Sequence, residues 1–283
     1  MALNPLVDSR DVRFVLYEMM DVIQLCKLPK YSAFDKDMFE DMINLAETMA
    51  VEQIYPTFAE GDKEGCHYDG ATKKVTIPKC YHPALDAFYE AGFGGMDIDE
   101  ELGGMGIPQV IAWACNEYFC AANYPLLMYP GLTHGAAELI EAFGTEEQKH
   151  MYLANMYSGK WGGTMCLTEP DAGSDVGALK TKAVRQSDGT YKISGQKIFI
   201  SSGDNDYYEN MIHPVLARIE GDPPGTKGIS IFIVPKYRVK ADGSLGDFND
   251  VNCAGIEHKM GIKGSATCTL SFGDNNNCIG WLL

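Results

Sequence analysis

The 283-residue sequence is short of positive charge. Lysine and arginine together number 23 against 39 aspartates and glutamates, which gives a formal net charge of −16. Contacts with nucleic acid or with anionic membranes need clusters of lysine and arginine, so we expect no nucleic-acid partner. Apolar residues make up 46% of the chain and charged residues 22%. This balance favours a packed core and excludes a disordered chain.

The sequence also lacks targeting, membrane-spanning and paired-cysteine signals. The first eight residues, MALNPLVD, have neither the basic region nor the apolar region of a secretory signal. No stretch approaches the roughly 18 apolar residues of a spanning helix. The nine cysteines are odd in number and include no CxxC pair, which predicts reduced, mostly buried thiols in a cytoplasmic protein. Cys66-His67 has no second ligand pair nearby, so we predict no metal site.

Several enzyme motifs are missing as well. There is no G-x-S-x-G sequence, and none of the six histidines belongs to a nucleophile motif, so hydrolase chemistry has no support. The glycines at Gly103, Gly104 and Gly106 lack the Gly-Lys-Ser/Thr ending of a phosphate-binding loop.

The first half of the chain has the pattern of helices. Apolar residues from Val12 to Ile23 recur at spacings of three and four, which predicts an amphipathic helix. Asp35 could cap a second helix that Pro56 ends, with one apolar face made by Phe39, Met42, Leu45, Ala46 and Met49. Residues 59–76 are polar and predict a loop. The capping box at 145–148 predicts a last helix that runs to about Tyr157.

From Ser158 onward the segments are short, rich in β-branched and aromatic residues, and bounded by turns. Asp188-Gly189 is a strong hairpin signal. The expected strands are 163–167, 183–186, 191–199, 211–219, 228–235 and 267–272. Helices followed by strands predict an α+β fold. We expect a helical domain at 1–157 and an antiparallel β-barrel or sandwich-like domain at 158–283, which could lack its last segment.

Two stretches could carry chemistry. In the first, Met165–Val176, a strand ends at the Thr168 hydroxyl, and Ala172-Gly173-Ser174 offers backbone N–H groups that could bind an anionic or carbonyl-rich ligand. A plain connection from a strand to a loop is the simpler alternative. In the second, Phe199 and Ser201 share one face of a strand and could contact a planar heterocycle. The simpler alternative is a core aromatic beside a solvent-exposed serine.

At this spacing, the two stretches together resemble the flavin-binding segments of the acyl-CoA dehydrogenase family, TEPxAGSD followed by G-x-K-x-[WF]-I-[ST]. Residues 256–267 are similar to its E-x-K-x-G-x-[KR]-x-S-x-T segment, and 276–282 to its N-A-I-G-x-L strand. The extension at 1–33, with Phe14-Val15-Leu16, and the segment 61–65 resemble the longer subgroup of the family. That subgroup includes the 3-methylmercaptopropionyl-CoA and the aryl- or cycloalkyl-acyl-CoA dehydrogenases.

The resemblance implies FAD as cofactor and an acyl-CoA as substrate, with α-proton abstraction and hydride transfer from the β carbon to flavin N5. It assigns the cofactor contacts to Met165, Leu167, Thr168, Gly173, Ser174, Phe199, Ile200 and Ser201. Met165, Leu167 and Thr168 would face the pyrimidine end of the flavin, and Ser174 would lie near the pyrophosphate and the acyl-CoA. Phe199 stands where the family more often has tryptophan, and Ser201 where it often has threonine.

One departure from the family is large. The family's catalytic base is a glutamate in a helical-bundle domain that follows the β domain, and nothing after Gln148 predicts a further long helix. We therefore expect an amino-terminal fragment without that domain and without the base, inactive alone. Glu169 and Glu257 stand where the family assigns no base. The resemblance also implies an electron-transfer flavoprotein as acceptor and a homo-oligomer for the complete enzyme. The alternatives are a non-catalytic binding or assembly protein on this scaffold, and an acyl-CoA oxidase.

Overall fold

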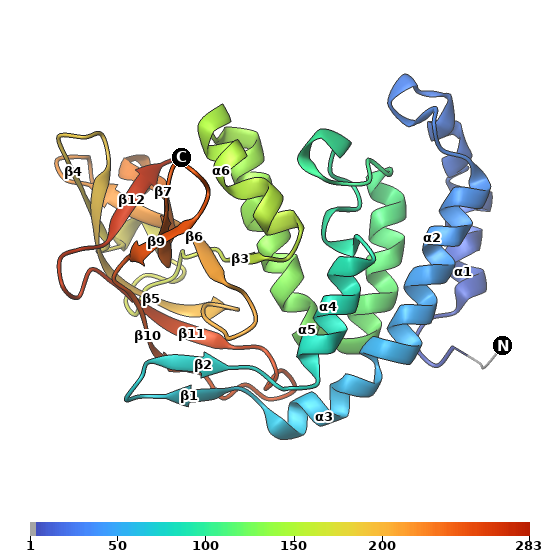
Figure 1. Ribbon diagram of the computed structural model, residues 1–283, viewed down its shortest axis with the longest axis horizontal. Helices are drawn as coiled ribbons and strands as arrows, with labels where there is room; N and C mark the ends of the chain where they lie inside the picture. The colour runs from blue at the N-terminus through green and yellow to red at the C-terminus, as the bar shows by residue number, and fades with distance from the viewer. Residues whose placement is uncertain (1–3) are drawn as a thin grey trace. The chain divides into compact units, whose positions relative to one another are not determined.

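The computed structural model describes residues 4–283, so Met1–Leu3 of the predicted amino-terminal extension lie outside the described residues. The chain divides into two compact units. The first comprises the residues up to Glu64 together with Pro78–Leu127, and the second comprises Gly65–Ile77 together with Met128–Leu283. Figure 1 shows the helices and strands of both. The predicted domain boundary at 157/158 stays a prediction; the last α-helix ends at Tyr157 and the next element is a strand.

The first unit is built of helices. Its α-helices are α1 (Ser9–Arg13), α2 (Lys36–Met49), α3 (Pro56–Glu64), α4 (Tyr81–Glu90) and the first part of α5 (Gln109–Phe143). Two π-helical turns cover Phe14–Met19 and Ala50–Ile54, and short 3₁₀ turns cover Val22–Lys27, Pro29–Tyr31, Phe93–Gly95 and Glu100–Leu102.

Two expectations for this unit need correction. The helix predicted from Val12 to Ile23 is interrupted at Asp21, which has a left-handed backbone with φ of 48°; Met19 and Met20 are therefore exposed instead of sharing the buried face. Asp35 does cap α2, since its side chain accepts the N–H of Met38. Leu45, however, is exposed, because the helical period places Ile43 on the buried face instead.

Residues 59–76 are not the predicted loop. Pro56 is the first residue of α3 and follows a π-helical turn, because a proline without an N–H is tolerated at the start of a helix. After α3 the chain forms a hairpin from β1 (His67–Asp69) and β2 (Lys74–Thr76). Its turn is held by Asp69, whose carboxylate accepts the N–H of Ala71 and the hydroxyl of Thr72.

Helix α5 is bent at Asn123, whose backbone is extended with φ of −159° and ψ of 86°. The buried Asn123 side chain caps the second stretch of this helix by accepting the N–H of Leu126. It also donates to Thr57 and accepts the hydroxyl of Tyr81. Helix α5 therefore bends at Asn123 because this residue acts as the N-cap of the second stretch.

The second unit holds the rest of α5, then α6 (Glu146–Tyr157) and the larger sheet. The predicted capping box is confirmed, with Thr145 and Gln148 each accepting the other's backbone N–H. The strands are β3 (Trp161–Gly163), β4 (Lys182–Arg185), β5 (Tyr191–Ser201), β6 (Asn210–Ile219), β7 (Ile229–Pro235), β8 (Tyr237–Val239), β9 (Leu245–Phe248), β10 (Val251–Ile256), β11 (Thr267–Phe272) and β12 (Ile279–Leu282).

The expected β-barrel is confirmed. β4, β5, β12, β7 and β6 pair in sequence, and β6 pairs again with β4, so the ring is closed. β11 and β10 extend the sheet from β5, and β3 runs parallel to β6. The barrel core is apolar and includes Tyr191, Ile193, Phe232 and Val234. Among residues 4–283 no α-helix follows α6.

Some strands differ from the sequence prediction. The strand expected at 163–167 ends at Gly163, and beyond it only Cys166 forms a bridge to β6. β8, β9 and β10 were not predicted as strands, because their short mixed sequences lack clear alternation. The hairpin turn at Asp188-Gly189 is confirmed by the left-handed Gly189, with φ of 86°, between β4 and β5.

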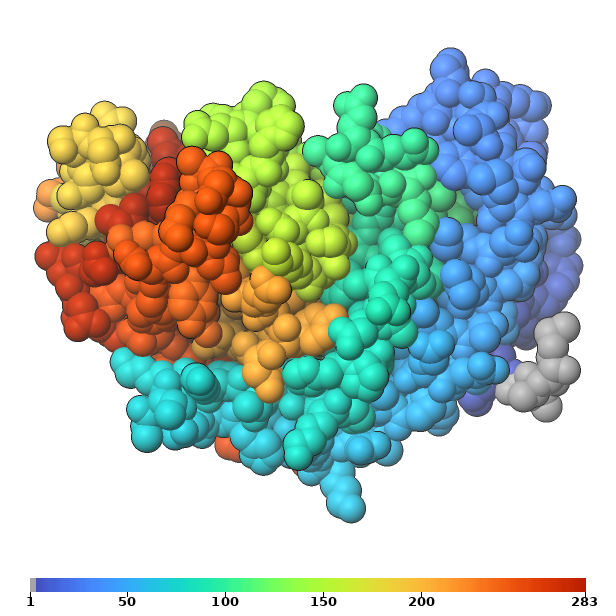
Figure 2. Space-filling view, in the orientation of Figure 1, coloured from blue at the N-terminus to red at the C-terminus, as the bar shows by residue number. Residues whose placement is uncertain are grey.

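The β1–β2 hairpin belongs to this second unit although it precedes the barrel by many residues. The Tyr68 hydroxyl donates to the carbonyl of Cys253 in β10 at 2.9 Å, and the Cys66 N–H donates to the carbonyl of Lys263 at 3.0 Å. Figure 2 shows the hairpin in cyan beneath the orange and red segments that end the chain.

Two expectations concern the chain as a whole. All nine cysteines are free, and five of them are buried, in line with the expectation of mostly buried thiols; three are partly buried and Cys120 is exposed. Within residues 4–283, none of the helices combines the length and the apolar character that crossing a membrane requires.

Candidate functional site

The two stretches singled out in the sequence lie side by side in the second unit. The backbone N–H of Ile198 donates to the carbonyl of Thr168 at 2.9 Å. The ammonium of Lys197 donates to the carbonyl of Leu167 at 3.0 Å and to the carboxylate of Glu169 at 2.8 Å. Three hydrogen bonds therefore join the start of the first motif to the middle of the second.

Glu169 is the most heavily bonded group of the site. It is 4% exposed, and it accepts Lys197, both backbone N–H groups of Lys180 and Thr181, and the Thr181 hydroxyl at 2.6 Å. Burial by itself would raise the pKa of Glu169, but the bonds from Lys197 and Thr181 hold that pKa below its ordinary value. A carboxylate saturated in this way does not take up a proton from a substrate, which agrees with the expectation that Glu169 is no base.

Lys197 is 0% exposed, and burial lowers the pKa of its ammonium while Glu169 opposes that shift. Its side chain points into the protein from a strand whose other inward residues, Tyr191, Ile193 and Ile200, are apolar. In the sequence, Lys197 is the lysine of the G-x-K-x-[WF]-I-[ST] motif and has no predicted role. The signal that could have identified Lys197 is a lysine at an inward position of an otherwise apolar strand. Lysine is almost never fully buried unless it is paired, so this position indicates a buried partner.

The backbone of the first motif presents unbonded donors. The N–H groups of Thr164 and Cys166 bond to carbonyls of β6, so in an extended chain the N–H groups of Met165 and Leu167 point to the opposite side. Among the described residues no acceptor bonds the N–H of Met165, Leu167 or Thr168. The edge that carries the predicted cofactor contacts is therefore open.

The turn that follows continues this edge. Glu169 and Ala172 exchange two backbone hydrogen bonds of 3.1 Å, which form a tight turn over Pro170. Gly173 and Ser174 come next, are exposed, and have no acceptor for their N–H groups within the described residues. A Cβ on Gly173 would meet only a methyl group of Thr168, at 3.5 Å, so the fold itself leaves room for a side chain there.

The second motif contains a bulge. Cys268 pairs with Ile200 and Leu270 with Lys197, so Ile198 and Phe199 together face a single residue of β11. Phe199 has φ of 59°, which is rare for an aromatic residue and costs on the order of 1–3 kcal/mol. The regular alternation assumed for Phe199 and Ser201 is thus interrupted at Phe199. Phe199 is 51% exposed, while Ile200 is buried and Ser201 is partly buried.

A further polar group lies beneath the first motif. The Thr164 hydroxyl is 2.8 Å from Nδ1 of His213, and the Cys166 thiol is 4.0 Å from the same nitrogen. Burial, with a smaller effect of Lys236, lowers the pKa of His213 to about 3, and burial raises the pKa of Cys166 to about 12. Both groups are neutral near pH 7, so this trio offers neither a thiolate nucleophile nor a charged histidine.

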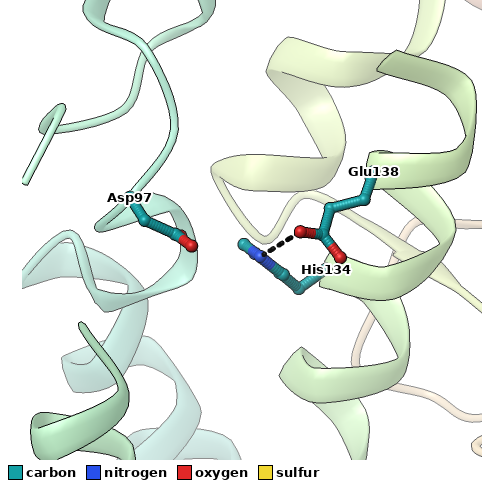
Figure 3. Close-up of side chains that lie close together, drawn as sticks. All are labelled: Asp97, His134 and Glu138. Carbon is teal, nitrogen blue, oxygen red and sulfur yellow. Dashed lines mark ion pairs between the residues drawn. The ribbon is translucent and has the colours of Figure 1, made fainter. Parts of the chain in front are cut away.

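The second part of α5 carries one histidine–carboxylate pair, which Figure 3 shows. Nε2 of His134 lies 3.6 Å from the carboxylate of Glu138, one helical turn away. The third side chain in that view, Asp97, belongs to the first unit. Two side chains supply fewer ligands than the three or four protein ligands typical of zinc sites, so the pair carries no metal assignment.

Comparison with known proteins adds family information. The model of the acyl-CoA dehydrogenase N-terminal domain matches residues 36–160, and that of the acyl-CoA dehydrogenase middle domain matches residues 164–275. The chain is 43% identical to the broad-specificity linear acyl-CoA dehydrogenase of Mycobacterium tuberculosis, over 97% of this chain and 45% of that protein. It is 36% identical to 3-methylmercaptopropionyl-CoA dehydrogenase of Ruegeria pomeroyi, over 97% of this chain and 46% of that protein.

A solved structure is similar as well. The acyl-CoA dehydrogenase of Bacillus anthracis, complexed with FAD, superposes with a TM-score of 0.67 and 27% identity over 87% of this chain and 38% of that one. The chain spans about half the length of the curated relatives that it matches.

Proposed function

Because the chain belongs to the acyl-CoA dehydrogenase family and carries the family's N-terminal and middle domains, we propose that its second unit binds FAD and an acyl-CoA thioester as part of an acyl-CoA dehydrogenase. One observation carries the proposal: a run of unbonded backbone N–H groups ends at Thr168, whose carbonyl accepts the N–H of Ile198, and the next residue, Phe199, is exposed and has a positive φ. Such donors suit the carbonyl and phosphate oxygens of a flavin nucleotide, and the ring suits its flat face.

All of the predicted contact residues except the buried Ile200 have a group that could bind the cofactor. The N–H groups of Met165 and Leu167 and the hydroxyl of Thr168 would bond the flavin ring. The backbone N–H groups of Gly173 and Ser174 would bond the pyrophosphate. Ser174 would also lie near the substrate. Phe199 would pack on the ring system, and Ser201 would add a hydroxyl beside Ile200. The positive φ of Phe199 is unfavourable for an aromatic residue. Such backbone strain is typical of segments whose conformation serves ligand binding.

FAD, when bound, supplies the acceptor for the hydride that leaves the acyl chain. In this proposal the residues of this chain bind and orient the cofactor and the substrate. We assign none of these residues the removal of the α proton. Glu169 is ionised, buried and saturated with donors, so it is unsuited to that step. We propose accordingly that this polypeptide by itself does not turn over an acyl-CoA.

The wider assignments are proposals of the same kind. The relatives act, by their names, on linear acyl-CoA and on 3-methylmercaptopropionyl-CoA, so the substrate class proposed here is an acyl-CoA thioester with the acyl group left open. The acceptor proposed for the reduced flavin is an electron-transfer flavoprotein, and the complete enzyme is proposed to be a homo-oligomer.

The test is a titration of FAD with the purified polypeptide, followed by quenching of flavin fluorescence. We expect saturable quenching, and a Gly173→Val variant that is as stable as the unmodified protein but binds FAD at least about tenfold more weakly. The fold has room at Gly173, whereas a side chain there would cover the adjacent N–H donors. Gly255→Val is the matched control, because a Cβ at Gly255 meets nothing within 4 Å and β10 holds no predicted contact.

Three results would count against the proposal. Absence of saturable quenching would favour a scaffold that does not bind flavin. Equal FAD affinity for the Gly173→Val and Gly255→Val variants would remove Gly173 from the site. Steady turnover of an acyl-CoA with an artificial electron acceptor would show that the polypeptide contains a base after all.

A further inference from the structure

The peptide between Leu167 and Thr168 is oriented by the second motif. Its carbonyl, on Leu167, accepts the Lys197 ammonium, and the next carbonyl, on Thr168, accepts the Ile198 N–H. In a trans peptide the N–H points opposite to the carbonyl, and the chain has no cis peptide bond among its described residues. The Thr168 N–H therefore points away from Lys197, and no acceptor in the described part of the chain bonds it.

The direction of this N–H depends on a buried charge. Lys197 is 0% exposed and has two acceptors, the Leu167 carbonyl and the Glu169 carboxylate. An ammonium without a carboxylate partner would be very unfavourable at such a position. Glu169 in turn is fixed by Thr181 and by the backbone N–H of Lys180, so the place of the ammonium is set from outside the motif.

Without the ammonium, the Leu167 carbonyl would lose the only partner that it has among residues 4–283. The peptide could then rotate and present its carbonyl, an acceptor, where the N–H donor stands now. Flavin carbonyl oxygens are acceptors too, so the rotated peptide would oppose binding.

We propose that Lys197 and Glu169 are positioning residues for flavin binding, a buried ion pair that holds the Leu167–Thr168 peptide with its N–H directed at the cofactor. The inference rests on the proposed function, since it concerns the same FAD site. It adds two residues to those predicted from the sequence, and both of them are buried.

The experiment separates positioning from simple structural support. Lys197→Met leaves Glu169 without its cation, so both stability to urea and FAD affinity fall, the affinity by at least about tenfold, equivalent to one lost hydrogen bond. The double variant Glu169→Gln, Lys197→Met leaves no unpaired buried charge, so stability recovers toward that of the unmodified protein. Its FAD affinity stays low, because nothing bonds the Leu167 carbonyl.

A second ion pair, in which the carboxylate is buried and the lysine partly buried, gives the matched control. Lys236 forms an ion pair with the buried Asp204 in the same unit and bonds neither Leu167 nor Thr168. Lys236→Met should lower stability and leave FAD affinity within about twofold. Recovery of FAD affinity together with stability in the double variant would overturn the inference, as would equal losses of affinity in Lys197→Met and Lys236→Met.

A measurement without FAD distinguishes this inference from the proposed function. Hydrogen exchange of the Ile198 amide, which bonds the Thr168 carbonyl, should be at least about tenfold faster in Lys197→Met than in Lys236→Met. If the unmodified polypeptide bound no FAD, the proposed function would fail, yet this exchange would still decide whether Lys197 orients the peptide. Equal exchange in both variants would refute that orientation.

Discussion

Acid should weaken the second unit through His213. The imidazole is fully buried beside Thr164, and burial lowers its pKa to about 3 from an ordinary 6.5. Because the folded-state pKa lies below the unfolded-state pKa, the stability that the neutral ring supports is complete above pH 6.5 and is lost as the pH falls toward 3. Linkage gives a loss of about 2 kcal/mol between pH 7.5 and pH 5 for this residue alone.

The assay is urea unfolding at those two pH values, read by tryptophan fluorescence in a Trp113→Phe background. The two tryptophans that remain, Trp161 and Trp281, both belong to the second unit, which also holds His213. A His213→Gln variant keeps a polar partner for Thr164 but does not titrate. The unmodified histidine protein should lose about 2 kcal/mol more than this variant on acidification.

The comparison with His213→Gln cancels the contributions of the carboxylates, which titrate in both proteins. If both proteins lost the same free energy between pH 7.5 and pH 5, the His213 ring would not be held neutral by burial, and the reasoning would be wrong.

Two further tests concern the packing around the site and the cap of the helix that precedes it. Gly195→Ala should destabilise the second unit by about 1–3 kcal/mol, because a Cβ there would lie 2.4 Å from the hydroxyl and 2.8 Å from the Cα of Thr181; an unchanged urea midpoint would contradict this. Thr145→Ala should cost about 1 kcal/mol by removing the α6 cap, while Ser158→Ala, at the other end of α6, should change stability by less than about 0.5 kcal/mol. Equal effects of those two variants would argue against the cap.

Local sequence signals determined the elements whose causes are local. The capping box at Thr145, the cap at Asp35 and the hairpin turn at Asp188-Gly189 rest on contacts within a few residues, and all three are confirmed. The order of helices and then strands, with the two motifs, likewise led to the α+β fold and to the family, because composition and motif spacing need no long-range contact to be recognised.

Tertiary structure decided what depends on distant partners. The break at Asp21, the outward position of Leu45 and the β1–β2 hairpin depend on which face packs against a neighbour, and periodicity alone misplaced them. The site itself follows the same division. The sequence predicted the residues at its surface, such as Thr168 and Phe199, whose contacts to the flavin stay a prediction.

The support beneath those residues was visible only in the fold. Lys197 and Glu169 lie 28 residues apart in the chain, and their pairing needs β5 to lie against the end of the first motif. The bulge at Phe199 depends on the register between β5 and β11, two strands that lie far apart in the sequence. A sequence records residue types and local spacing. Burial arises only when distant segments pack together, and burial is what gives a charge pair or a strained aromatic residue its role in the site.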